Sequence, residues 1–121
     1  MVRVLVVEED DDLARLLALV LGDEGHAVDR VRSVRAGLAL EWPVDVAVVD
    51  GLLASWRNLD AADRGPLRAL AARVPVVLTS TRAWAASADP AALGVAAVVP
   101  KPYDLEALLD AVRRAAGPVG G

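Results

Sequence analysis

The chain has 121 residues, of which 55% are hydrophobic, and this length suits one domain with one sizeable core. Its formal net charge of −4 argues against binding nucleic acid, and the absence of cysteine excludes disulfides and cysteine-ligated zinc. No apolar run approaches the ~20 residues of a membrane span, and Met1 leads directly into a strand-like run without a signal-peptide pattern. We therefore expect a cytoplasmic domain that contacts neither nucleic acid nor membrane.

The first half of the chain alternates short apolar runs with helical patterns. Residues 2–7 are a β-branched apolar run that is too short for a helix, and the five acids of residues 8–12 follow it. A helix is then predicted by apolar residues at helical spacing, with a buried face of Leu13, Leu16, Leu17, Val20 and Leu21. Residues 26–31 indicate a weaker strand, and Ser33 is the expected N-cap of a helix that reaches about residue 41.

The second half repeats this alternation. Three further strands are predicted at residues 44–49, 75–78 and 95–99. A helix is predicted at residues 61–72, where Gly65 and Pro66 should delay its start, and a weaker Ala-rich one at residues 80–92. Asp104 is the expected cap of a last helix, with an apolar face of Leu105, Leu108, Leu109 and Val112.

Five strands that alternate with five helices predict an α/β domain. The strands should form a parallel sheet that right-handed crossovers cover on both faces. The near-continuous apolar strands agree, since a strand buried on both sides does not alternate. We assign residues 1–116 to this domain and residues 117–121, "GPVGG", to a flexible tail or the start of a linker.

Polar residues stand where the predicted strands end. They are Glu8 and Glu9 after the first strand, Asp50 after the third, Thr79 after the fourth and Lys101 after the fifth. Open parallel sheets bind ligands at the carboxyl ends of their strands, so we expect these side chains to meet on one rim. The second strand ends only in Asp29 and Arg30. With Arg32 and Arg35 these residues indicate a solvated face at a sheet edge.

The chemistry of this rim suits a divalent cation. Three crowded carboxylates repel one another unless a cation joins them, and hard oxygen ligands with room for water suit Mg²⁺. Lys101 is the only lysine among thirteen basic residues. Its compact ammonium can pair with Asp50 in one state and with a phosphoryl oxygen in another, whereas arginine presents a rigid fork. Pro102 fixes the backbone that presents this ammonium.

The motifs "VLVVEEDDDLARLL", "DVAVVDGLL", "PVVLTS" and "KPY" follow one another along the chain. With them the chain resembles the receiver domain of two-component response regulators, from Val2 to about Ala115. The resemblance implies a flavodoxin-like (βα)5 doubly wound parallel sheet with strand order 2-1-3-4-5.

The resemblance also implies a role for each residue of the rim. Asp50 would be the phosphoacceptor, Thr79 would bond the phosphoryl group, and Lys101 would pair with it. The Mg²⁺ ligands would be Glu8, Glu9, Asp50 and the backbone carbonyl of Leu52.

The partners follow from the same resemblance. A histidine kinase or a phosphotransfer protein would donate the phosphoryl group in a Mg²⁺-dependent reaction, and the charge change would switch contacts with a downstream effector. The domain would be no enzyme beyond catalysing its own phosphorylation and dephosphorylation. A homodimer through the fourth and fifth helices is compatible with the sequence.

The chain departs from the family pattern at four positions. They are Glu9 in place of Asp, Ala54 in place of Pro, Val98 in place of an aromatic residue, and Pro100 just before the lysine. Glu9 and Val98 favour a second hypothesis, a receiver-like interaction module that is not phosphorylated and acts by constitutive protein contacts. Asp50, Thr79 and Lys101 favour the phosphoacceptor. A flavin-binding domain of the same topology would need a Ser/Thr/Gly-rich loop where the five acids stand.

Overall fold

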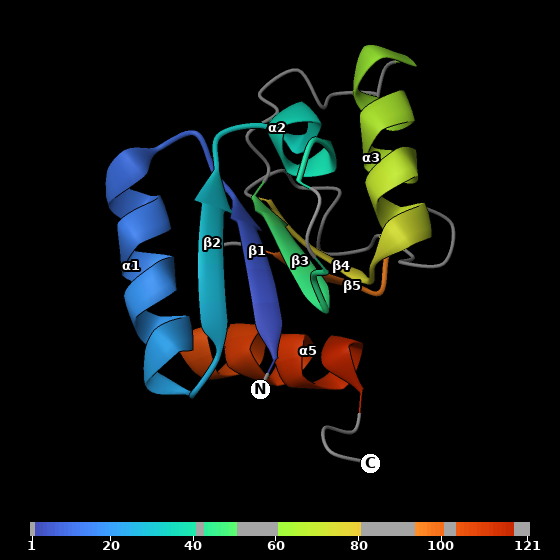
Figure 1. The fold of residues 1–121 in the computed structure, drawn as a ribbon. Helices are drawn as coiled ribbons and strands as arrows, with labels where there is room; N and C mark the ends of the chain where they lie inside the picture. Colours follow the sequence, from blue (N-terminus) through green and yellow to red (C-terminus); the bar gives the residue numbers. More distant parts are fainter. Residues whose placement is uncertain (1, 41–42, 51–60, 81–93, 101–103, 118–121) are drawn as a thin grey trace.

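The computed structural model describes residues 2–40, 43–50, 61–80, 94–100 and 104–117, with the backbone alone at residues 50, 61–64, 80 and 100. Figure 1 shows a central sheet with helices on both sides. Along the chain the elements are β1 (Arg3–Val7), α1 (Asp11–Asp23), β2 (Ala27–Val31), α2 (Val34–Leu38), β3 (Val46–Asp50), α3 (Ala61–Arg73), β4 (Val76–Ser80), β5 (Ala97–Pro100) and α5 (Leu105–Ala116). The weak helix predicted at residues 80–92 falls almost wholly outside the described residues.

The five strands form one sheet in the order β2-β1-β3-β4-β5, and every pair of neighbours is parallel. This confirms the predicted doubly wound fold and its strand order. Because all strands point the same way, their carboxyl ends lie along one edge of the sheet. The switch in strand order falls between β1 and β3, where open α/β sheets place their ligand sites.

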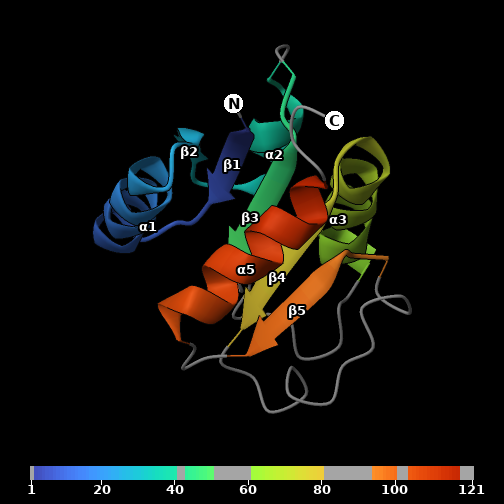
Figure 2. The same cartoon turned by 90° about the horizontal axis from the view of Figure 1, so that it is seen from below.

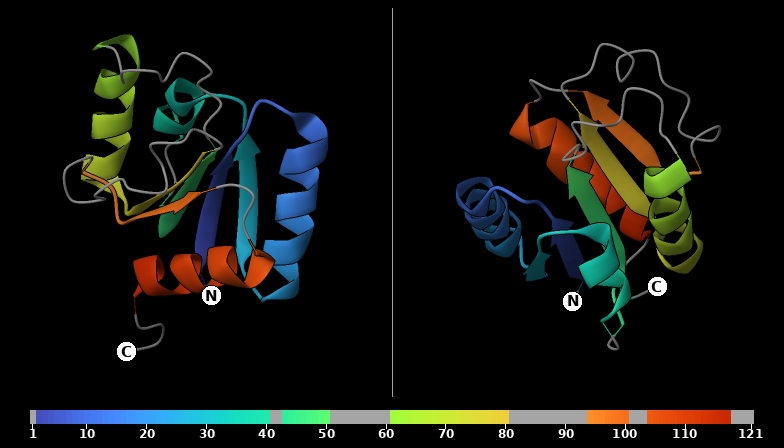
Figure 3. Two further views of the ribbon diagram at one scale, coloured as in Figure 1. Left: turned by 180° about the vertical axis from the view of Figure 1, so that it is seen from behind. Right: turned by 90° about the horizontal axis from the view of Figure 1, so that it is seen from above.

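The sheet separates two apolar cores, one on each face. The first joins alternate strand residues such as Val4, Val6 and Val48 to α1 and α5. The second joins the intervening residues, such as Leu5 and Val49, to α2 and α3. Figures 1 and 3 show α5 on one side of the strands and α2 and α3 on the other, and Figure 2 shows α5 lying across β3 and β4. Both faces of the sheet are therefore covered, which explains why the strands read as apolar runs.

Three helices begin at polar caps, and two of these caps, Ser33 and Asp104, are the ones expected from the sequence. The carboxylate of Asp10 accepts hydrogen bonds from the amides of Asp12 and Leu13 at the start of α1, at 2.9 and 3.1 Å. Ser33 Oγ accepts from the Ala36 amide at 3.0 Å, and Asp104 accepts from the Glu106 amide at 3.1 Å. These bonds satisfy first-turn amides that have no partner within the helix.

Two predicted helix boundaries are wrong. The helix after Ser33 ends at Leu38, short of residue 41. The third helix begins at Ala61 with Pro66 inside it, so Gly65 and Pro66 do not delay its start. Pro66 removes one intrahelical hydrogen bond, but Leu67 and Leu70 on the next turns are each only 3% exposed. Burial of these two leucines offsets the lost bond.

The predicted apolar faces of the first and last helices are wrong at Leu16 and Leu105, whose side chains are 49% and 41% exposed. The other positions are buried or packed partly against the first core: Leu13, Leu17, Val20, Leu21, Leu108, Leu109 and Val112. Leu16 lies about 100° around the helix from Leu17, and α1 rests on the sheet along one side only. In α5 the buried stripe begins at Leu108, one turn after the helix starts.

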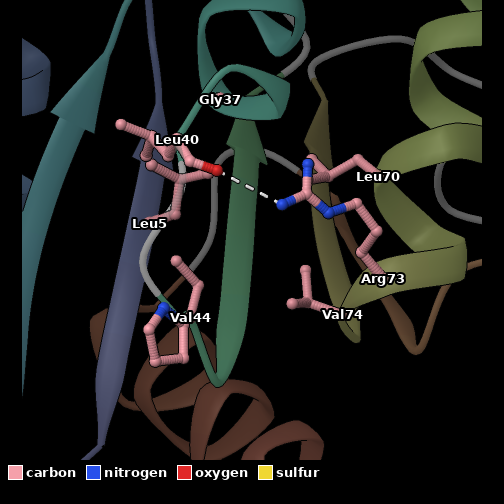
Figure 4. A pocket seen from close by; sticks show the side chains of 8 residues that line it. Leu5, Gly37, Leu40, Val44, Leu70, Arg73 and Val74 are labelled. Atoms are coloured by element: carbon pink, nitrogen blue, oxygen red, sulfur yellow. Dashed lines mark hydrogen bonds between the residues drawn. The ribbon is translucent and has the colours of Figure 1, made fainter.

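Arg73, the last residue of α3, closes the short helix α2. Its guanidinium donates from Nη1 to the carbonyl of Leu38 at 2.8 Å and from Nη2 to that of Leu40 at 3.3 Å. Figure 4 shows the side chain reaching across β3 over a hollow of about 310 Å³, which is lined by Leu5, Gly37, Leu40, Pro43, Val44, Leu70, Arg73 and Val74. A Cβ on Gly37 would come within 2.9 Å of a Leu5 methyl, so glycine lets α2 approach β1 closely.

Replacing Arg73 by Ala should lower the free energy of unfolding by about 1 kcal/mol, because two carbonyls at the end of α2 lose their donors. Urea denaturation followed by circular dichroism measures the change. Arg68→Ala is the matched control, since Arg68 is an exposed arginine of the same helix with no hydrogen bond in the described structure. Its cost should stay within ~0.5 kcal/mol. Equal costs for the two substitutions would contradict the role of Arg73.

Candidate functional site

The strand register aligns three of the predicted site residues along the carboxyl edge of the sheet. Val7 of β1 pairs with Val49 of β3, so the residues that follow them, Glu8 and Asp50, occupy neighbouring positions. Asp50 in turn pairs with Thr79 of β4. Neighbouring strands lie about 4.8 Å apart. The backbone thus carries two acids and a hydroxyl on three consecutive strands.

Glu8 is a buried acid at the head of the acidic loop, residues 8–11. It is only 5% exposed, and its Oε1 accepts a hydrogen bond from the Asp10 amide at 3.1 Å. Its own amide donates to the carbonyl of Val31 at 3.0 Å, which ties the end of β1 to the end of β2. Burying a carboxylate is costly unless hydrogen bonds or cations compensate it. Glu8 therefore keeps a carboxylate inside the protein at the start of the acidic loop, where a backbone amide holds it.

Glu9 differs from Glu8 in its surroundings. It is exposed, and its side chain makes no hydrogen bond or ion pair in the described structure. Its backbone carbonyl accepts a hydrogen bond from Nη2 of Arg32 at 3.2 Å. The two successive acids therefore present one fixed and one adjustable carboxylate.

Thr79 is the buried hydroxyl of the site, with no exposed surface. The sequence alone allows an ordinary strand-end threonine, and the register adds that it pairs with Asp50. On the following strand, Pro100 pairs with Ser80, so β5 ends at the same edge of the sheet. Lys101 and Leu52 themselves lie outside the described residues, as does Ala54.

Among the described residues, the predicted metal ligands have the chemistry that a hard cation needs. Glu8 and Glu9 supply carboxylate oxygens, which Mg²⁺ prefers. The described side chains contain no cluster of three acidic, histidine or cysteine residues, and the Asp50 side chain is not among them. Two of the three predicted carboxylates therefore stand in succession, and the backbone of the third lies on the adjoining strand.

A hollow of about 320 Å³ adjoins Glu8 on the side of β2. It is lined by Glu8, Asp11, Ala14, Arg15, Arg30, Val31 and Arg32. The sequence predicts a solvated face for the arginines near β2. Arg30 and Arg32 are both exposed, but Arg32 also contacts the acidic loop. Arg32 bonds to Glu9 and lies 3.8 Å from a carboxylate oxygen of Asp11. Its place directly after the strand that pairs with β1 is the signal from which this contact follows.

Val98 occupies the position at which the family pattern has an aromatic residue. It is partly buried and packs against the core shared by α2 and α3. Its register partner is Leu78, the residue before Thr79. A branched aliphatic side chain fills this position, and the aromatic rotation that the family pattern implies has no counterpart here.

Comparison with known proteins identifies the family of the chain. The two-component response regulator PhoP of Pseudomonas aeruginosa is 33% identical over 122 residues, covering 95% of this chain. The chain is a response-regulator receiver domain. A receiver protein from Burkholderia phymatum, 21% identical, matches the structure with a TM-score of 0.75 over 97% of this chain and 96% of its own. The response regulator TrrA of Thermotoga maritima in complex with Mg²⁺ and BeF, 19% identical, gives 0.71 over 94% and 98%.

These comparisons set the scope of the assignment. The receiver domain spans about half the length of the curated relatives it matches, 53% in the case of PhoP. No protein-family model matches the chain. Among the described residues, no helix is long and apolar enough to cross a membrane. A receiver domain that no family model matches is divergent, and its departures from the family pattern at Glu9 and Val98 agree with this.

Replacing Asp10 by Ala should lower the free energy of unfolding by about 1 kcal/mol, because two amides of the first turn of α1 lose their acceptor. Chemical denaturation measures the loss. Asp12→Ala removes the same charge from the same turn without removing the cap, so its cost should be about 0.5 kcal/mol or less. If the two substitutions cost the same, the effect of Asp10 is one of charge and not of capping.

Proposed function

We propose that this receiver domain accepts a phosphoryl group on Asp50 from a histidine kinase or a phosphotransfer protein, with Mg²⁺ bound. The observation that carries the proposal is the register that sets Glu8, Asp50 and Thr79 at the ends of three adjacent strands. Phosphorylation changes the charge at this edge and biases contacts with an effector. The domain acts on itself, because the residue that reacts is its own and is not released as product.

Each residue of the site has a separate role in the proposed reaction. The carboxylate of Asp50 attacks phosphorus, a P–O bond forms, and the bond from phosphorus to the donor breaks. Glu8, Glu9, Asp50 and the carbonyl of Leu52 would hold Mg²⁺, which supplies positive charge to the phosphoryl oxygens. The hydroxyl of Thr79 donates a hydrogen bond to one of these oxygens, and the ammonium of Lys101 pairs with another.

Two observations support a Mg²⁺-dependent reaction. The buried Glu8 carboxylate stands beside the strand that carries Asp50. A structural neighbour, TrrA, was solved in complex with Mg²⁺ and BeF. We further propose a cytoplasmic location, which the lack of cysteine suits. The hypothesis of a constitutive, unphosphorylated interaction module is retained only as an outcome of the experiment below.

Incubation with Mg²⁺ and a small-molecule phosphodonor should add the mass of one phosphoryl group to the wild type and none to Asp50→Asn. Intact-mass spectrometry at neutral pH measures the product. Asp23→Asn is the matched control, since Asp23 is an exposed acid at the far end of α1. It should be labelled as the wild type is. No labelling from any donor or kinase would favour the unphosphorylated interaction module.

Replacing Glu9 by Asp should tighten Mg²⁺ binding by about threefold to tenfold. The glutamate arm is one methylene longer, about 1.5 Å, and Mg²⁺ demands near-ideal octahedral geometry. Calorimetric titration of Mg²⁺ into both proteins gives the dissociation constants. Glu24→Asp shortens an acid at the other end of α1 and should leave the constant unchanged. Equal affinity of the wild type and Glu9→Asp would contradict the argument.

A further inference from the structure

Arg32 makes two contacts with the acidic loop. Its Nη2 donates to the carbonyl of Glu9 at 3.2 Å, and its Nη1 lies 3.8 Å from Oδ2 of Asp11. We propose that Arg32 is a positioning residue of the metal site, which holds the backbone of the acidic loop so that the Glu9 carboxylate faces the cation. This inference rests on the proposed function for the cation itself. The contacts that carry it exist without the cation.

The acidic loop is held at three points, and Arg32 supplies the third. Glu8 Oε1 accepts from the amide of Asp10, and the carboxylate of Asp10 accepts from the amides that open α1. The bond from Arg32 to the Glu9 carbonyl fixes the peptide between Glu9 and Asp10. The direction in which a side chain leaves the backbone follows from the peptide planes on either side of it. Because the Glu9 side chain has no other tether in the described structure, this plane decides where its carboxylate points.

Arg32 is itself held on both sides. It follows Val31, the last residue of β2 and the register partner of Val7. It precedes Ser33, the cap of α2. Arg32 thus lies beside β1 on the side of β2, whereas Asp50 lies beside β1 on the side of β3. A guanidinium on the β2 side would hold the loop and leave the β3 side of β1, where Glu8 and Asp50 would hold the cation, unobstructed.

The planar fork is needed for this double contact, because two nitrogens of one guanidinium engage the carbonyl and the carboxylate together. The pair with Asp11 contributes little, since the side chains of Arg32 and Asp11 are 72% and 71% exposed. The carbonyl bond therefore carries most of the energy, and the fork fixes the direction from which Nη2 reaches that carbonyl. Outer residues that orient metal ligands affect affinity by about 10- to 100-fold, and solvent around Arg32 reduces this to about threefold to tenfold.

An effect of charge alone would change the affinity for Mg²⁺ in the opposite direction. A cation near the site repels Mg²⁺, so its removal would tighten binding. Arg30 separates the two effects, because it lines the same hollow, is exposed, and makes no hydrogen bond or ion pair in the described structure. Arg30→Ala reports the effect of charge only, and Arg32→Ala reports charge and positioning together. Arg32→Lys keeps the charge and loses the fork.

The experiment is a calorimetric titration of Mg²⁺ into the wild type, Arg32→Ala, Arg32→Lys and Arg30→Ala. We expect Arg32→Ala and Arg32→Lys to bind about threefold to tenfold more weakly, and Arg30→Ala to bind equally or slightly more tightly. Solvent exchange of the Asp10 amide, measured by NMR without metal, should accelerate in Arg32→Ala and not in Arg30→Ala. Unfolding midpoints in urea should agree among the four proteins, so the loss is not one of folding.

Three outcomes decide the matter. Equal constants for Arg32→Ala and Arg30→Ala, while the wild type binds Mg²⁺, overturn the role of Arg32 and leave the proposed function intact. An Arg32→Lys protein that binds as the wild type does overturns the argument from the fork. A wild type that binds no Mg²⁺ contradicts the metal site itself and overturns the positioning role with it, and the amide exchange then shows whether Arg32 holds the loop at all.

Discussion

The parallel register of β1, β3 and β4 is the constraint on which the site depends. Backbone hydrogen bonds fix which residues stand side by side, and Val7–Val49 and Asp50–Thr79 are such pairs. Since all strands run the same way, the residue that leaves each strand appears at a common edge. The candidate site residues are therefore placed by the backbone. Side-chain packing keeps it in place by burying the strands on both faces.

Much of the fold could be predicted because the strands are short, apolar and separated by capped helices. Ser33 and Asp104 mark helix starts that the structure confirms. Helix ends were harder, because the end of α2 depends on Arg73, 35 residues after Leu38. The exposure of Leu16 could not be predicted either, since it depends on which side of α1 meets the sheet. A local pattern cannot report a partner that arrives from a distant segment.

The sequence predicts a site of residues at strand ends, and the register sets the backbones of Glu8, Asp50 and Thr79 at neighbouring positions. The roles of these residues, and those of Glu9, Leu52 and Lys101, stay predictions. Arg32 could not be assigned from the sequence, because the predicted strand order sets β2 next to β1 but does not give the paths of the two loops that follow them. The contrast is physical. Strand ends converge by topology, whereas a side-chain contact between two loops depends on their exact paths.

The sheet that divides the interior has a consequence for how this molecule tolerates change. Consecutive residues of one strand, such as Val4 and Leu5, belong to different cores and touch different helices. An altered volume on one face is thus met by α1 and α5, while α2 and α3 keep their packing. Substitutions more than ~7–10 Å apart without shared partners act almost independently. A lineage of such domains can accordingly remodel one helical layer, and with it the surface offered to partners, while the strand ends stay in place.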